Sequence, residues 1–172
     1  MSAMIPLPKR RGRPRKNPLP LTVEPKPLPK ALSDSEVLTS ITERFEVLRE
    51  MVEGVVKRDV RSFVVSGAAG MGKSHTIREV LERAEKKNGL KYIIISGVIT
   101  PVNLYKILYK YSSKNCVVVL DDADSIFFSD DGMNILKAAL DTTNRRVISW
   151  LSESSALKEE DIPPMFLFEG AM

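Results

Sequence analysis

Residues 67–74 constrain the fold more than any other stretch, because they read GAAGMGKS, the pattern G-x-x-x-x-G-K-S. They follow a short β-branched run, FVVS at 63–66, and they lead into helical spacing of apolar residues from Lys73 to Lys87, with Asn88-Gly89 as the predicted end of the helix. Glycines allow a tight turn in which successive N–H groups point into one concavity, and a helix N-terminus adds partial positive charge for an anion. The stretch therefore predicts a strand, a phosphate-binding loop (P-loop) and a helix, in that order.

The next segments continue this alternation of strand and helix. YIIIS at 92–96 predicts a second strand, and Thr100-Pro101 supplies a cap and a first-turn proline for a helix to about Tyr111. CVVVLDD at 116–122 predicts a third strand, apolar throughout as a strand buried on both faces must be. We therefore expect an α/β fold with right-handed crossovers, a P-loop NTPase core in which helices cover both faces of a parallel sheet.

Segments on either side of this pattern complete the predicted domain. An amphipathic helix, capped by Ser33 or Asp34, should run to about Lys57. We expect this helix to pack on the domain that follows it. After the third strand we expect a helix from Met133 to Leu140, followed by a hairpin of two short strands at 146–150 and 165–170. The predicted organisation is thus an arm, residues 1–32, and a nucleotide-binding domain, residues 33–172.

The loop predicts the ligands ATP and Mg²⁺. Lys73 should reach the β- and γ-phosphates, and the Ser74 hydroxyl should ligate the metal. His75 follows on the first turn of the helix, where a packed or half-exposed side chain is a more ordinary role than catalysis. The predicted nucleotide-binding residues are Gly67, Ala68, Ala69, Gly70, Met71, Gly72, Lys73, Ser74 and His75.

The acids at the end of the third predicted strand supply the rest of the site. Asp121 is the first acid after the apolar run, at the position where P-loop NTPases carry the carboxylate that orients Mg²⁺. Asp122 is the candidate for orienting the attacking water, with Lys73 as the second catalytic residue. A solvated acid at a strand end is the alternative for Asp122, and we interpret Asp124 as a loop acid.

Charge divides the chain into two parts. Residues 1–30 carry eight Lys or Arg against one Glu, whereas the remainder carries 18 against 21. The first thirty residues also hold eight of the eleven prolines, so they predict a disordered arm that binds polyanions. The segment RGRPRK, with Arg11, Gly12, Arg13, Pro14, Arg15 and Lys16, resembles the AT-hook, whose arginines enter a narrow A·T minor groove. A generic basic tail for RNA or other polyanions, or a targeting segment, is the alternative.

Composition excludes several protein classes. The chain is 43% hydrophobic and 28% charged, and no run approaches the length of a membrane-spanning helix. No apolar stretch follows the first basic residues, as it would in a secretory signal. The single cysteine, Cys116, cannot form an internal disulfide and is expected in the core. We expect a protein of the cytoplasm without a membrane partner.

With these motifs in place, the chain resembles the nucleotide-binding core of AAA+ ATPases over residues 36–172. The Asp121-Asp122 pair is similar to that of initiator-type branches, where Asp also replaces the usual Glu. Three stretches resemble AAA-type ATPases of tailed bacteriophages: GVITPVNLYKILYKYSS, LDDADSIF and LKAALDTTNRRVISWLSES.

The resemblance also predicts parts that this sequence does not contain. AAA+ cores continue with a fourth strand carrying a polar sensor residue, an arginine finger and a helical lid, whereas this sequence stops at FEGAM. The expectation is an incomplete core, with Arg145 and Arg146 as surface charges rather than the finger. A homo-oligomer or a full-length AAA+ partner is then the expected assembly.

Two functional hypotheses remain open at this point. One is an ATPase domain that acts in DNA transactions in the host cytoplasm, tethered to duplex DNA by the arm; the sequence leans toward this enzyme. The other is a non-hydrolysing module that binds nucleotide and works as a DNA-bound adaptor or regulator. A small-molecule kinase shares the P-loop but fits the apolar strand with two terminal acids less well.

Overall fold

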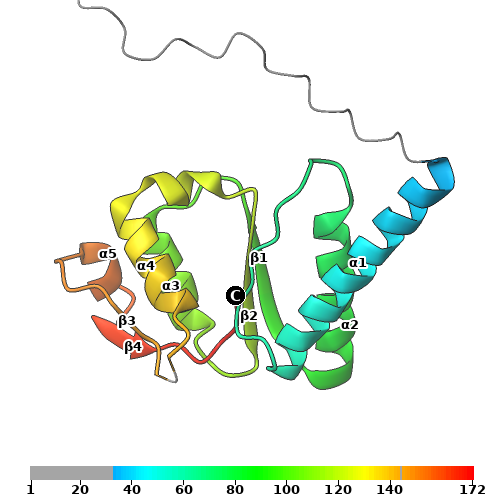
Figure 1. Cartoon of the computed structure of the whole chain (residues 1–172). Helices are drawn as coiled ribbons and strands as arrows, with labels where there is room; N and C mark the ends of the chain where they lie inside the picture. Colours follow the sequence, from blue (N-terminus) through cyan, green and yellow to red (C-terminus); the bar gives the residue numbers. More distant parts are fainter. Residues whose placement is uncertain (1–32, 144) are drawn as a thin grey trace, which may run out of the picture. The chain divides into compact units, whose positions relative to one another are not determined.

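A computed structural model describes residues 33–143 and 145–172 of the chain, and its contacts group Asp34 to Met172 into one unit. Two helices come first, and helices and strands then alternate from α2 to α4 (Figure 1). In chain order the elements are α1 (Asp34–Lys57), α2 (Lys73–Asn88), β1 (Lys91–Ser96), α3 (Pro101–Lys110), β2 (Cys116–Asp121), the 3₁₀ helix η1 (Asp124–Phe128), α4 (Asp130–Leu140), β3 (Val147–Ser149), α5 (Ser155–Lys158) and β4 (Met165–Leu167).

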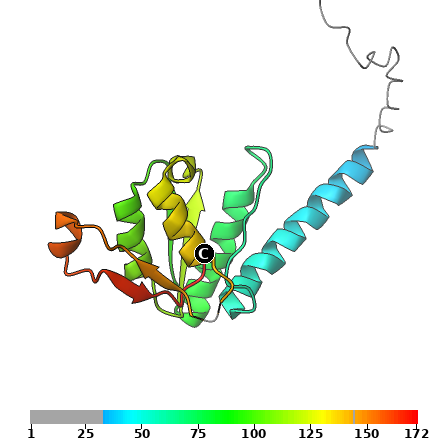
Figure 2. The ribbon, with the colours of Figure 1, turned by 60° about the vertical axis from the view of Figure 1, so that its left-hand side comes forward.

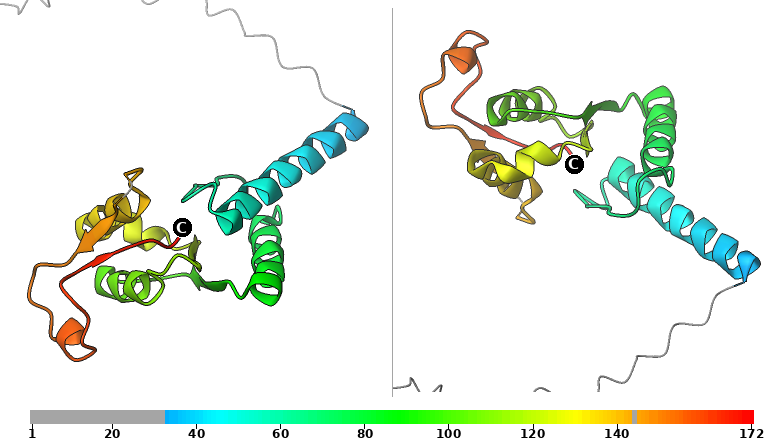
Figure 3. Two further views of the ribbon diagram at one scale, coloured as in Figure 1. Left: turned by 90° about the horizontal axis from the view of Figure 1, so that it is seen from below. Right: turned by 90° about the horizontal axis from the view of Figure 1, so that it is seen from above.

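A small parallel sheet separates two helical layers. β1 and β2 pair in register from Lys91 opposite Cys116 to Ser96 opposite Asp121. Successive side chains of a strand point to opposite faces. Accordingly Val117 packs in an apolar cluster with residues of α1 and α2, whereas Val118 packs in a second cluster with residues of α3 and α4. Figure 3 shows the two pairs of helices on opposite sides of the strands. The predicted α/β class and the predicted parallel pairing are confirmed.

Local signals set most helix boundaries where they were predicted. Gly89 ends α2 in the left-handed conformation, and its N–H bonds to the Glu85 carbonyl. The Thr100 side chain caps α3 by accepting from the Asn103 N–H. α4 begins three residues earlier than predicted, because the Ser129 side chain accepts from the Gly132 N–H and so starts the helix at Asp130.

The strand predicted at residues 63–66 is absent from the structure. These residues form neither a strand nor a turn. A strand needs a hydrogen-bonded neighbour, and here only the Phe63 N–H has one, the Met172 carbonyl at 3.2 Å. The prediction of a strand at residues 63–66 was therefore wrong.

The C-terminal hairpin forms as predicted. β3 and β4 are antiparallel, with Ile148 opposite Phe166, and they project beside α3 and α4 (Figure 2). Both of these side chains point inward, and the Phe166 ring packs edge-on against Tyr105 with centroids 5.1 Å apart. The hairpin therefore extends the α3–α4 layer of the core.

The prediction that Arg146 is a surface charge was wrong, whereas Arg145 is exposed as expected. Arg146 is 5% exposed and donates to the carbonyls of Ala139 and Gly170. Its guanidinium also lies 4.9 Å from the centre of the Phe168 ring. Burial, and then the like charge of Arg61, lower the pKa of Arg146. A cation can be buried here because two main-chain carbonyls replace its water.

Cys116 is buried and unpaired, as predicted. Tyr105 is fully buried, and Tyr109 and Trp150 pack at the edge of the same cluster. None of the helices in the described ranges is long and apolar enough to cross a membrane.

Candidate functional site

The glycine-rich loop adopts the backbone conformation that its sequence implies. Gly70 and Gly72 have φ angles of 75° and 93°, in the region that side chains with a Cβ avoid. Gly72 is also the N-cap of α2, and no side chain bonds to the first turn of that helix from this position. The loop therefore leads directly into a helix N-terminus whose first N–H groups no N-cap side chain covers, as an anion site requires.

The Lys73 side chain, at the end of the loop, reaches back to the first two residues of the loop. Its ammonium donates to the Gly67 carbonyl at 2.9 Å and to the Ala68 carbonyl at 2.8 Å. The positive charge is therefore held against the main chain at the start of the loop. A phosphate bound at the N-terminus of α2 would interact with the partial positive charge of the helix and with the ammonium of Lys73.

Ser74 and Asp121 meet, although 47 positions separate them in the chain. The Ser74 hydroxyl, on the first turn of α2, donates to the Asp121 carboxylate at the end of β2, with an oxygen–oxygen distance of 2.7 Å. Sequence analysis predicted these two residues as the magnesium ligands, and the fold brings their oxygens within hydrogen-bond distance.

Asp122 and Asp124 differ from Asp121 in their surroundings. Asp122 is exposed and has a φ angle of 52°, a left-handed conformation that Asp tolerates better than most residues. It turns the chain sharply out of β2 beside the phosphate loop, and it lines the same cavity as Lys73, Ser74 and Asp121. Asp124 is exposed as well and begins η1.

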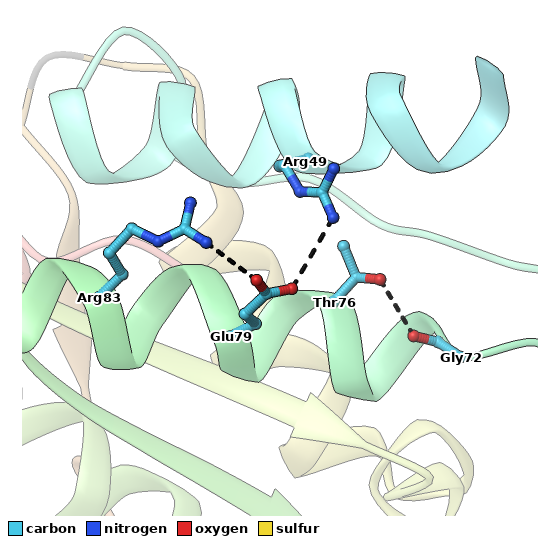
Figure 4. A network of polar contacts seen from close by, with 5 residues as sticks. All are labelled: Arg49, Gly72, Thr76, Glu79 and Arg83. Carbon is cyan, nitrogen blue, oxygen red and sulfur yellow. Dashed lines mark hydrogen bonds and ion pairs between the residues drawn. The ribbon is translucent and has the colours of Figure 1, made fainter. Parts of the chain in front are cut away.

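His75 and Thr76 lie next to each other on the first turn of α2 and differ in exposure. His75 is exposed, so it is not a packed residue. Thr76 is buried and its hydroxyl donates to the Gly72 carbonyl at 3.2 Å, which ties the last glycine of the loop to α2 (Figure 4). Sequence analysis missed Thr76; its position four residues after a loop glycine was the available signal.

α1 packs against α2, the helix that follows the glycine-rich loop. Glu79 of α2 forms ion pairs with Arg83 one turn later, at 2.9 Å, and with Arg49 of α1, at 3.7 Å (Figure 4). All three are partly solvated, so these pairs orient the helices more than they stabilise them. Burial of Leu48, Val52 and Val55 against α2 supplies the main packing energy.

The site opens into a cavity of about 320 Å³. Lys73, Ser74, Asp121 and Asp122 lie on its lining, and most other lining residues are apolar. The described residues contain no cluster of three or more His, Cys, Asp or Glu that would hold a metal ion alone. One hydroxyl and one carboxylate suit Mg²⁺, which keeps several waters and takes further oxygens from a phosphate ligand.

The basic arm, including Arg11, Gly12, Arg13, Pro14, Arg15 and Lys16, lies outside the described residues. The prediction of DNA binding by these residues therefore remains a prediction, as does the boundary drawn at residue 33.

Comparison with known proteins adds one relative. Over 140 residues the chain is 36% identical to an Enterobacteria phage T4 protein, described as an uncharacterized 36.7 kDa protein in the nrdC-mobD intergenic region. The match covers 81% of this chain and 43% of the relative, so the chain spans less than half of that protein's length. No family model matches the chain. No solved structure matches it either. The similarity supports the phage part of the resemblance, and the relative's description adds no activity.

Proposed function

We propose that this chain is the nucleotide-binding part of an AAA+-like P-loop ATPase that acts in DNA transactions. The observation that carries the proposal is the 2.7 Å contact between the hydroxyl of Ser74 and the carboxylate of Asp121. A glycine-rich loop alone is a common turn, but a loop serine that meets the acid of a neighbouring parallel strand is the arrangement that a magnesium–triphosphate site needs.

Each residue of the site has a defined role in this proposal. Lys73 and the loop amides bind the phosphates, and Ser74 and Asp121 hold the metal by exchanging their mutual hydrogen bond for metal ligation. Bound Mg²⁺ supplies charge neutralisation for the leaving phosphate. Asp122, at the cavity lining next to Asp121, accepts a proton from water and orients it.

The second candidate is a module that binds nucleotide without hydrolysing it. Lys73 is the one cation among the described residues that line the cavity. Phosphoryl transfer is accelerated by an additional positive group that meets the charge of the transition state. A chain with a single cation binds and retains nucleotide unless a partner supplies the second charge, which favours an adaptor or regulator.

Calorimetric titration with ATP and Mg²⁺ tests the binding step. Lys73→Ala should weaken binding at least about tenfold, since one charge-assisted phosphate contact contributes roughly 1.5–3 kcal/mol. Lys87→Ala is the matched control, because it removes the same charge from the exposed end of the same helix. Absence of magnesium–ATP binding by the folded wild-type chain would contradict both candidates.

Steady-state phosphate release separates the two candidates. Release that Lys73→Ala and Asp122→Asn both abolish supports the ATPase; binding without release supports the adaptor. Ser74→Ala should weaken the dependence on Mg²⁺ while it leaves metal-free nucleotide binding nearly unchanged.

The proposed role of the arm in DNA binding has its own test. Binding to A·T-tract and G·C duplexes is compared for the wild type, for Arg11→Ala/Arg13→Ala and for Lys26→Ala/Lys30→Ala, which removes the same charge from the same arm. An AT-hook loses its A·T preference only in the arginine variant. A generic tail weakens equally in both variants and shows no preference.

A further inference from the structure

A separate pocket lies where α1 ends, beside the start of β2. Its volume is about 300 Å³, and four cations line it: Arg58, Arg61, Lys114 and Arg146. The acid on its lining, Glu169, forms an ion pair with Lys114 at 3.4 Å. Its lining residues differ throughout from those of the cavity beside the glycine-rich loop. We call it the basic pocket.

Long-range hydrogen bonds gather the cations of the basic pocket at one end of the domain. The Arg61 guanidinium donates to the Thr143 carbonyl at 2.7 Å, across 82 positions of the chain. From the same loop, Arg146 donates to the Gly170 carbonyl at 2.5 Å. The Gly170 N–H in turn donates to the Ser112 carbonyl at 3.1 Å, in the segment that leads into β2. The folded chain itself therefore holds the positive charges together.

Arg146 is a buried cation whose charge has no carboxylate partner. It is 5% exposed, and two carbonyls and the Phe168 ring surround its guanidinium. Within residues 33–143 and 145–172 it forms no ion pair. Burial lowers the pKa of Arg146, and the like charge of Arg61 lowers it further, against the weaker effect of Asp141. Buried charges in proteins are normally paired, so the wall of the basic pocket carries positive charge that an anion would compensate.

Arg58 adopts a backbone conformation that favours glycine. Its φ angle is 70°, and its N–H donates to the Val55 carbonyl near the end of α1. A residue with a Cβ is strained in this left-handed region, and such strain is typical of functional sites. The side chain of Arg58 nevertheless lines the basic pocket. Glycine would end the helix with less strain, so the guanidinium is what this position supplies.

The chemistry of the basic pocket fits a phosphate group. Guanidinium groups bind two phosphate oxygens at once, and a lysine adds a compact positive charge. Arg58, Arg61 and Lys114 are exposed, whereas Arg146 forms a buried wall. The basic pocket is therefore accessible to a phosphate that belongs to a larger molecule.

Further exposed cations lie beside the basic pocket. Arg145 precedes Arg146 in the chain, and Lys91 donates its N–H to the carbonyl of Asn115, next to Lys114. A polyanion interacts with the pocket and with these flanking cations together, whereas a free phosphate interacts with the pocket alone. This arrangement favours a nucleic-acid backbone, which carries a negative charge at every phosphate.

We propose that the basic pocket binds one phosphate group of a nucleic-acid backbone. Arg146 is the buried wall behind the phosphate, and Arg58, Arg61 and Lys114 bind its oxygens from the solvent side. This inference goes beyond the proposed function, because it places a nucleic-acid contact on the folded domain and requires neither ATP nor the arm. Its test is therefore made without nucleotide.

The first experiment measures the affinity of the complete chain for a mixed-sequence DNA duplex over a series of NaCl concentrations. Arg58→Gly should weaken binding at least about threefold and lower the slope of log K against log salt by about one, since one phosphate contact is lost. Its stability in urea should not fall, because glycine relieves the positive φ angle. Arg44→Ala removes an exposed arginine from the first half of α1 and should leave the slope unchanged. Equal slopes in the two variants would overturn the proposal.

Glu169→Gln gives a prediction of opposite sign. It removes the acid that lines the basic pocket and pairs with Lys114, so binding of the duplex should strengthen about twofold or more. Partial unfolding does not strengthen binding at a folded site, so this variant separates loss of charge from loss of structure. Unchanged or weaker binding by Glu169→Gln would count against a phosphate in this pocket.

The NMR signal of the Arg146 Nε–H group identifies the source of the phosphate. The duplex should shift this signal at a lower concentration of phosphate groups than inorganic phosphate does. A shift that needs no more inorganic phosphate than duplex, or no shift with either, would overturn the proposal. Loss of magnesium–ATP binding would contradict the proposed function and leave these three readouts unaffected.

Discussion

The two edges of β2 differ in what they have to pair with. One edge pairs with β1 along six residues, from Cys116 to Asp121. The opposite edge makes one bridge, from Val117 to Ala171, and then continues unpaired. The same residues, the apolar run CVVVL, form both edges of β2. The difference between the edges therefore does not come from the sequence of β2.

This difference teaches that strand propensity alone does not produce a strand. FVVS at 63–66 is as β-branched as the sequence of β2, yet it has no regular secondary structure, and of its four N–H groups only that of Phe63 makes a backbone hydrogen bond. Unpaired edges with exposed valines are also sites of self-association. The glycine-rich loop follows residues 63–66 directly, whereas the other edge of β2 pairs with β1 along its whole length.

The largest effect is expected from placing a charge first in β2 and then in residues 63–66. Val118 is 0% exposed and Val64 is 82% exposed. Val118→Asp buries an unpaired carboxylate, so it should lower the free energy of unfolding by about 4 kcal/mol or more. Val64→Asp should change it by less than about 0.5 kcal/mol. Urea denaturation followed by circular dichroism measures both. Similar losses in the two variants would show that residues 63–66 are packed as tightly as β2.

An intermediate effect is expected at Arg146, which fastens the C-terminal segment to the core. Arg146→Met keeps most of the side-chain volume but leaves the Ala139 and Gly170 carbonyls without their donor. We expect a loss of about 2–3 kcal/mol in urea denaturation, because two buried acceptors are left unsatisfied. Faster hydrogen exchange at Ala171 should accompany this loss, since Gly170 precedes the bridge to β2.

Arg145→Met is the matched control, because Arg145 is exposed and adjacent in the sequence. It should change the free energy of unfolding by less than about 0.5 kcal/mol. Equal losses from the two substitutions would contradict the buried role of Arg146.

Sequence reasoning predicted the elements whose signals are local. Gly89, Thr100 and the apolar run of β2 each indicate a boundary or a buried strand through their own chemistry, and each lies where expected. The pairing of Ser74 with Asp121 was also predictable, because a loop and a strand end meet at one edge of a parallel sheet. Each of these features depends on one local motif, so the sequence alone indicates it.

Other features depend on neighbours in space and were missed. Arg145 and Arg146 are identical in sequence terms, and only the packing of Phe168 and two carbonyls separates a buried arginine from an exposed one. The 3₁₀ helix η1 and the four-residue α5 are too short to show a helical period. The strand predicted at 63–66 does not form, because a strand requires hydrogen bonds to a neighbouring segment and of these residues' N–H groups only that of Phe63 makes a backbone hydrogen bond.

The smallest effect is expected at Tyr105, in α3. Its hydroxyl donates to the Pro163 carbonyl at 2.8 Å and so joins α3 to the hairpin connection. Tyr105→Phe should cost about 1 kcal/mol at neutral pH in urea denaturation. Burial raises the pKa of Tyr105 to about 12, from an ordinary value near 10.

The pH dependence of this interaction follows from the sign of the pKa shift. Between about pH 10 and 12 the unfolded chain loses the Tyr105 proton while the folded chain keeps it, so the unfolded state binds fewer protons and stability falls as pH rises. The contribution is fully present below pH 10 and lost above 12. Tyr105→Phe should therefore flatten the decline of stability across this window, with Tyr109→Phe as the control for removing one tyrosine from the same helix. An unchanged decline in Tyr105→Phe would mean that the Tyr105 hydroxyl loses its proton as readily in the folded chain as in the unfolded chain, which would contradict its burial in the core.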